Sequence, residues 1–331
     1  MLALFRTNQL LASVLLVLYV LILWWPLWVW PDAYPIAFSV EGWGLLGDCI
    51  STWSQSWPWW VHRFVAALWA VVIGGTVAVL SLAHRLDTPG NLYAGVVFLL
   101  LISAIPAILY VHPLTFATLL VGVVLALVWQ SYQVWWADEL IFFTGFWIAI
   151  GALLFAPFFW LVLWVGWAFA LLRKFTLREV GVLLSGFFVP CWLIGVWFYW
   201  HDRLPEFWVR WPLAELWKWT SPRAMWQQYW PWLLVWGIAV LWILLTYRVL
   251  RQRRILPVQK KLQSLYLLLI WLSALSLAYM GKWGVLVLSL SFVPLSIFWG
   301  LWLTRLSAKW ALGIHWLAIA LILSSLLYPL L

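Results

Sequence analysis

The stretch LLASVLLVLYVLILWWPLWVW, residues 10–30, decides the fold class. It carries no charged side chain, and it matches the roughly 20 apolar residues that an α-helix needs to cross a bilayer. It is too long for the core of a signal peptide, and no small-residue cleavage site follows it. We therefore expect a retained first transmembrane helix.

The whole chain shares this character. Its 331 residues are 67% hydrophobic, 20% aromatic and 9% charged, whereas soluble domains are about 45–50% apolar and about 25% charged. One core cannot bury that much apolar side chain, so lipid must cover the rest. The composition excludes a soluble enzyme, a disordered tail and a secreted disulfide module. It predicts an all-α, polytopic integral membrane protein.

Apolar runs of suitable length and their flanking charges predict about eleven transmembrane helices. No repeat of fixed period and no low-complexity linker divides the chain, so we expect one domain over residues 1–331. The expected spans are 10–30, 64–82, 92–111, 115–131, 141–156, 157–172, 179–200, 231–247, 264–280, 284–303 and 310–328. Pro106, Pro190 and Pro294 fall inside spans, where neighbouring helices can satisfy the freed carbonyls.

The basic residues fix an orientation. With the N-terminus inside, the inside segments carry 13 cations and four acids, and the outside segments carry six of each. The whole excess of +9 therefore lies inside, as the positive-inside rule requires. Because the cations flank apolar spans, we expect no nucleic-acid partner. The loop 248–263, with six cations, predicts an anchor at an anionic leaflet. Segment 132–140 is the exception, with Asp138, Glu139 and no cation.

Two sequence patterns carry no chemistry in this context, and one histidine leaves two interpretations open. Cys49 and Cys191 lie far apart and form no metal-binding pattern. The GWGLLG stretch at 42–47 spells a dinucleotide fingerprint, but it sits in a loop between membrane helices without the required βαβ unit. His315 lies inside the last span, where an ionisable group is a functional candidate. A neutral imidazole packed between helices is the competing interpretation.

Tryptophan is the compositional outlier, with 35 residues. Indole rings favour bilayer interfaces, and most of these rings fit that role. Two outside loops, 31–63 and 201–230, are long enough to hold structure and are rich in tryptophan. Rings there also offer a flat apolar platform for a sugar face and an N–H donor.

The loop 31–63 is the most informative stretch, because it contains Glu41 and Asp48. A helical run would place carboxylates seven residues apart on one face. Such a pair suits a general base and a clamp for an acceptor or a divalent cation. A solvated polar face on an interfacial helix explains the same pattern.

Four segments resemble an uncharacterised family of multi-pass inner-membrane proteins from Bacteroidota. The resemblance runs from residue 1 to about 210. Its motifs are MLALFRTNQ at residues 1–9, FSVEGWGLLGD at 38–48, TGFWIAIGALLF at 144–155 and RKFTLRE at 173–179. It implies a bacterial inner-membrane location with the N-terminus in the cytoplasm.

That family is itself similar to the GT-C glycosyltransferases, which use polyprenyl-phosphate sugars. In those enzymes an outside loop after the first helix bears an acidic residue, which acts as base or binds the acceptor. The resemblance places Glu41 in that role, with Asp48 as a following acid. The chain departs from the pattern in three ways. Its next outside loop is only His112-Pro113, and no soluble acceptor-binding domain follows the last span. The segment Trp53 to Trp60, after Asp48, lacks the Tyr and Asp that are common at that place in the family.

The resulting expectation is a periplasmic-face glycosyltransferase with a polyprenyl-phosphate donor. Glu41 and Asp48 are the expected catalytic residues. The expected substrate-binding residues are Arg63, His112, His201, Arg203 and Arg210, with the arginines holding the lipid phosphate. The alternative is a non-catalytic subunit of a cell-envelope assembly that binds other membrane proteins. A transporter is less well supported, since the spans show no inverted repeats.

Overall fold

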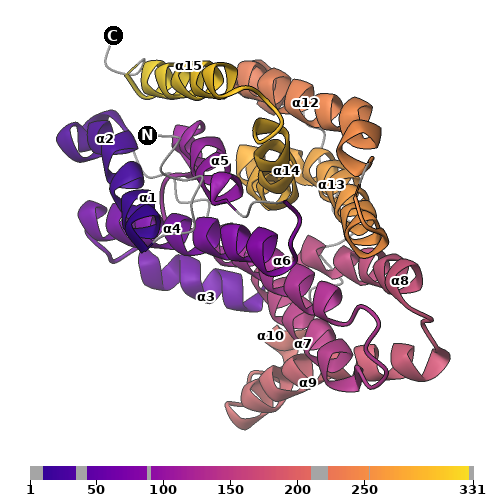
Figure 1. Ribbon diagram of the computed structural model, residues 1–331. Coiled ribbons are helices and arrows are strands. Elements are labelled where there is room, and N and C mark those ends of the chain that lie inside the picture. Colours follow the sequence, from indigo (N-terminus) through magenta and orange to yellow (C-terminus); the bar gives the residue numbers. More distant parts are fainter. Residues whose placement is uncertain (1–9, 35–42, 88–90, 210–222, 253, 328–331) are drawn as a thin grey trace.

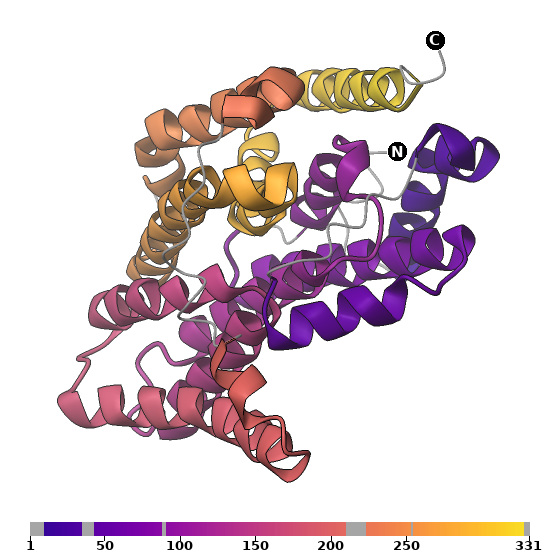
Figure 2. The same cartoon turned by 180° about the vertical axis from the view of Figure 1, so that it is seen from behind.

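The computed structural model describes residues 10–34, 43–87, 91–209, 223–252 and 254–327. In these ranges it contains helices and no strand. The coarse prediction of an all-α fold is therefore confirmed. Figures 1 and 2 show α12 and α15 along one side of the molecule and α9 along the opposite side.

The α-helices, labelled as in Figure 1, are α1 (Leu10–Leu23), α2 (Trp25–Val29), α3 (Leu45–Ser54), α4 (Trp59–Ala83), α5 (Tyr93–Ser103), α6 (Pro113–Gln130), α7 (Asp138–Leu154), α8 (Leu161–Leu172), α9 (Leu177–Trp200), α10 (Leu204–Val209), α12 (Arg223–Arg251), α13 (Leu256–Trp283), α14 (Leu288–Leu303) and α15 (Ala308–Leu327). The 3-10 turns are η2 (Pro31–Ala33), η3 (Pro106–Ile108), η4 (Ala156–Trp160) and η5 (Gly284–Val287).

Long apolar helices dominate the described part of the chain. Six segments there are long and apolar enough to cross a membrane: 59–83, 113–130, 177–200, 230–251, 256–303 and 308–327. Helices over 93–103 and 156–172 are apolar but shorter. This confirms, in its coarse form, the prediction of a multi-pass membrane protein in contact with lipid.

Proline divides some of the expected spans and not others. Pro26 breaks the first run into α1 and α2, because proline lacks the N–H and clashes with the preceding turn. Pro106 lies in η3, so the expectation that it sits inside a spanning helix is wrong. Pro190 and Pro294 do remain inside α9 and α14.

Glycine allows two helices to cross at backbone contact. A Cβ on Gly145 of α7 would lie 2.0 Å from the carbonyl oxygen of Leu183 in α9. Reciprocally, a Cβ on Gly186 of α9 would lie 2.0 Å from the carbonyl oxygen of Phe142. Small residues at such crossings are typical of membrane helices, where close packing drives association.

Polar contacts collect charged residues at one end of the bundle. Lys261 Nζ lies 2.9 Å from His84 Nδ1, and Arg254 Nη2 lies 2.9 Å from a carboxylate oxygen of Asp87. These contacts join the end of α4 to the start of α13 and the residues just before it. The segments involved are ones that the charge count assigned to the same side of the membrane.

The segment 132–140, which broke the charge pattern, finds its cation elsewhere in the chain. Asp138, at the start of α7, pairs with Arg178 of α9. Arg178 also lies over the ring of Trp136, 5.9 Å from its centroid. Pairing with a basic segment therefore accounts for the acidic exception.

Candidate functional site

The candidate site is built on α3, whose position depends on glycine. A Cβ on Gly44 would lie 2.5 Å from the carbonyl oxygen of Leu153, and one on Gly47 would lie 2.2 Å from that of Leu154. These glycines of the GWGLLG stretch therefore let α3 pack directly on the end of α7. The motif serves helix packing, in agreement with the sequence argument against a dinucleotide site.

Asp48 lies in the first turn of α3 and is half-buried. Its Oδ1 accepts a hydrogen bond from the backbone N–H of Trp43 at 3.3 Å. A carboxylate in this place also interacts favourably with the positive end of the helix dipole. Asp48 therefore holds the entry to α3 and is partly exposed.

Glu41 lies outside the described residues. The expectation that one helical face carries both Glu41 and Asp48 is nevertheless wrong. Gly44, between them, has extended backbone with φ 162° and ψ 170°, and α3 begins only at Leu45. The glycine that permits close packing also interrupts the helix.

Trp43 connects α3 to a buried aromatic cluster. Its ring lies 6.5 Å from that of His112, 6.4 Å from that of Phe155 and 6.2 Å from that of Trp283, measured between centroids. Its backbone carbonyl accepts a hydrogen bond from Ala156 N at 3.1 Å. Sequence reasoning missed this residue. The flanking glycines were the available signal, since they mark a place of close approach.

His112 is buried, with 3% of its surface exposed, and it precedes the first residue of α6. Among the described residues neither ring nitrogen has a partner at hydrogen-bonding geometry. Burial lowers the pKa of His112 to about 3, and the nearby carbonyl of Ile108 opposes part of this shift. His112 is therefore neutral at neutral pH and faces aromatic rings rather than an open site.

Arg63 is also buried, with 2% exposure, near the start of α4. Its Nη1 donates to the carbonyl oxygen of Leu109 at 2.7 Å, and its Nη2 donates to that of Tyr34 at 2.5 Å. The guanidinium thus ties α4 to the segments that follow η2 and η3. Both terminal nitrogens are engaged, which leaves little capacity for the phosphate predicted as its ligand.

The second outside loop meets the first at α10. Arg203 forms a two-point ion pair with Glu206, with Nε donating at 3.0 Å and Nη2 at 2.7 Å. This pairing raises the pKa of Arg203, and Cys49 of α3 acts on it in the same direction when ionised. Arg203 is therefore close enough to Cys49, the residue after Asp48, for their charges to interact. Figures 1 and 2 both show α10 beside the start of α3.

His201 and Arg210 are the other two predicted substrate-binding residues of this loop. His201 is exposed at the end of α9, where its Nδ1 lies 2.8 Å from the carbonyl oxygen of Trp197. Arg210 lies outside the described residues. The structure therefore brings Arg203 near Cys49, the residue that follows Asp48, while Arg63 and His112 are buried in the packed interior.

A divalent cation was an open expectation for this site. Within the described ranges, no three His, Cys, Asp or Glu side chains gather in a way that could hold a metal ion. Asp48 offers one carboxylate, and Glu206 is already paired with Arg203. We therefore derive no chemical step through a cation.

Comparison with known proteins adds no relative. No protein-family model, curated protein or solved structure matches the chain.

Proposed function

We propose that the protein is a membrane-embedded glycosyltransferase that takes a sugar from a polyprenyl-phosphate donor. The observation that carries the proposal is the meeting of α3 with α10. It sets the guanidinium of Arg203 within electrostatic range of Cys49, the residue that follows Asp48, on segments from the two long loops. A carboxylate and a guanidinium on neighbouring segments suit the two tasks of this reaction, proton removal and phosphate binding.

In this proposal the acceptor hydroxyl oxygen attacks C1 of the donor sugar. The bond between C1 and the phosphate oxygen breaks, and polyprenyl phosphate leaves with the bonding electrons. Glu41 takes the hydroxyl proton, and Asp48 orients the acceptor. Arg203 and Arg210 stabilise the charge that develops on the phosphate, because a guanidinium matches phosphate geometry.

The buried residues have supporting roles in this account. Arg63 holds the backbone on which the first loop rests, as its two carbonyl contacts indicate. His112 packs against Trp43 and so supports the start of α3. His201 stays a predicted substrate-binding residue at the edge of the site.

We further propose eleven membrane crossings in a bacterial inner membrane, with the N-terminus in the cytoplasm. The expected span 10–30 falls on α1 and α2, and every other expected span falls on one helix alone or with an adjoining short turn. The gathering of basic residues at one end supports the orientation. The α3–α10 meeting point then faces the periplasm.

A non-catalytic envelope subunit is the second candidate, and the surface of α9 favours it. Only 28% of the residues in the most apolar 18-residue stretch of α9 are buried. It exposes a dense set of aromatic side chains: Phe188, Trp192, Trp197, Tyr199 and Trp200. Such a face is as well suited to a neighbouring protein helix as to lipid.

Gentle-detergent purification from the native membrane, followed by mass spectrometry, separates these two candidates. Co-purified polyprenyl phosphate or its sugar conjugate supports the transferase. A stoichiometric set of envelope proteins without such a lipid supports the subunit and contradicts the transferase.

A further inference from the structure

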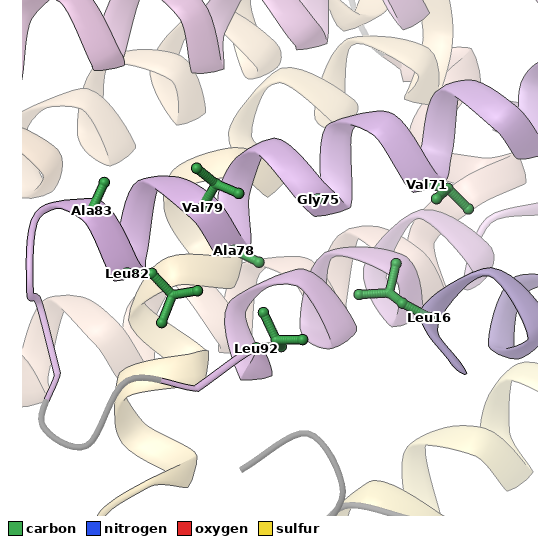
Figure 3. Close-up of a pocket in the computed structure, with 8 residues that line it drawn as sticks. All are labelled: Leu16, Val71, Gly75, Ala78, Val79, Leu82, Ala83 and Leu92. Carbon is green, nitrogen blue, oxygen red and sulfur yellow. The ribbon is translucent and has the colours of Figure 1, made fainter. Parts of the chain in front are cut away.

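A groove of about 350 Å³, lined by apolar side chains, runs along the second half of α4, away from the candidate functional site. Figure 3 shows Gly75, Ala78 and Leu82 of α4 along it, with Leu16 of α1 and Leu92 opposite. Gly75 leaves part of the space open, since a Cβ built there would meet no atom within 4 Å. The lining is mostly apolar, so it favours an apolar occupant over water.

The groove continues the outer face of α4. Leu68, Val72 and Val79 are 53%, 41% and 62% exposed on this helix, which is one of the candidate membrane spans. Val79 also lines the groove. The occupant must therefore come from the hydrocarbon phase that covers this face.

The length of the groove selects a single chain from one leaflet. Its lining extends from Val71 to Ala83 on α4, which is about 18 Å at the helical rise of ~1.5 Å per residue. Half of a bilayer's hydrocarbon core is ~15 Å. A phospholipid acyl chain fits this depth, whereas a long polyisoprenoid would extend well beyond it.

An exposed cation stands at the end of the groove. Arg85 follows two residues after Ala83 and has φ 48°, in the left-handed region that favours glycine. The backbone N–H of Arg85 bonds to the carbonyl of Leu82, and that of Leu86 to the carbonyl of Ser81, which closes α4 with a Schellman motif. Arginine thus occupies a position where glycine would suit the backbone better.

Other charged groups near Arg85 have contacts within the protein. Asp87 pairs with Arg254, and His84 contacts Lys261. Burial and the Lys261 charge lower the pKa of His84 to about 4, so its imidazole is neutral at neutral pH. Among the described residues Arg85 has no ion-pair partner, and the net charge beside the groove is positive.

We propose that the groove is a binding site for an anionic phospholipid, with one acyl chain along α4 and the phosphate at Arg85. This site is independent of the proposed transferase activity and lies at the other end of α4. Shape and length select the acyl chain, and the cation selects the anionic headgroup.

Photo-crosslinking from the groove edge tests the site. The variant protein with Val79→p-benzoylphenylalanine is reconstituted in vesicles of phosphatidylcholine with a minor fraction of phosphatidylglycerol. Leu241→p-benzoylphenylalanine on α12 is the control, because Leu241 is 54% exposed and does not line this groove. Intact-mass spectrometry then reads the lipid in each adduct. We expect phosphatidylglycerol to be enriched at position 79 about fivefold over position 241, which corresponds to ~1 kcal/mol for one cation.

Two further substitutions separate headgroup from chain recognition. Adding Arg85→Gly should abolish the enrichment without harming the fold, since glycine suits the backbone there, and Arg85→Lys should keep it. Gly75→Leu should fill the groove and remove co-purified phosphatidylglycerol in native mass spectrometry. Gly237→Leu is the matched control, because its added Cβ also meets no atom within 4 Å. It should leave the co-purified phosphatidylglycerol unchanged.

Three outcomes would overturn the proposal. Equal lipid composition at positions 79 and 241 would mean that α4 only faces bulk lipid. A cross-link from position 79 to a second copy, or to another segment of the same chain, would mean that protein fills the groove. Enrichment that survives Arg85→Gly would remove the headgroup assignment.

Discussion

Arg63 donates a hydrogen bond from Nη1 to the carbonyl oxygen of Leu109 at 2.7 Å, across 46 residues of chain. The same guanidinium donates to the backbone carbonyl of Tyr34, so one side chain binds two backbone carbonyls. Arg63 therefore serves the architecture beneath the candidate site.

Replacing Arg63 by Met should lower the free energy of unfolding by about 3 kcal/mol, because a buried carbonyl left unsatisfied costs about 1–3 kcal/mol. Thermal unfolding in detergent micelles measures this loss. Arg203→Met is the matched control, since Arg203 is exposed, and it should leave stability nearly unchanged. Equal stability of Arg63→Met and the wild type would contradict the bracing role.

The crossing of α7 and α9 predicts a sharp difference between two glycines. Gly145→Ala should destabilise the protein by about 1–3 kcal/mol, because its Cβ would overlap the Leu183 carbonyl and force the helices apart. Gly166→Ala in α8 meets no atom within 4 Å, and it should be neutral or stabilising by up to ~1 kcal/mol through helix propensity. Thermal unfolding of both variants measures this difference in stability. Similar unfolding midpoints would contradict the backbone contact.

Burial of His112 predicts a pH dependence of stability. Its folded pKa of about 3 lies below the ordinary value, so the unfolded chain binds more protons between these two values. Stability should therefore be complete above about pH 6.5 and fall as the pH drops toward 3. Removing this titration with His112→Phe should flatten the profile.

His112→Phe keeps an aromatic ring against Trp43 and costs no helix cap, since the His112 side chain makes no cap hydrogen bond. His84 has its pKa lowered to about 4, so part of the slope should remain in both proteins. Unfolding midpoints at several pH values give the two slopes. The prediction is wrong if they coincide.

Native cysteines report the orientation. Cys49 is exposed beside Asp48, whereas Cys191 is buried. A membrane-impermeant maleimide added to spheroplasts should therefore label Cys49, and Cys49→Ser should remove the label. Labelling of Cys49 only after the membrane is opened would place the α3–α10 meeting point in the cytoplasm and reverse the proposed topology.

The sequence allowed the helical, multi-pass character to be predicted, because composition acts over the whole chain. The acidic segment around Asp138 did not fit the charge pattern of the other inside loops. Its partner Arg178 is 40 residues away in the chain. Only the packing of α7 against α9 brings these two residues together.

The details of the site depended on long-range contacts that no local pattern contains. The spacing of Glu41 and Asp48 predicted one helical face, but Gly44 approaches Leu153 and breaks the helix. In the sequence His112 lies in a two-residue loop, where an exposed polar side chain would be ordinary. Its ring instead packs against that of Trp43, which lies 69 residues earlier in the chain. Pro106 lies in a 3-10 turn and Pro190 lies inside a helix, although both fall within expected spans.

The most direct test of the proposed function is donor turnover in proteoliposomes. A polyprenyl-phosphate-linked hexose is supplied with the wild type, Glu41→Gln and Asp32→Asn, and released polyprenyl phosphate is measured. Asp32 is an exposed acid of the same loop and serves as the matched control. We predict release by the wild type and by Asp32→Asn, and a loss of at least about 100-fold in Glu41→Gln, as expected for a general base. Wild-type rates in Glu41→Gln, or no release by the wild type itself, would contradict the account.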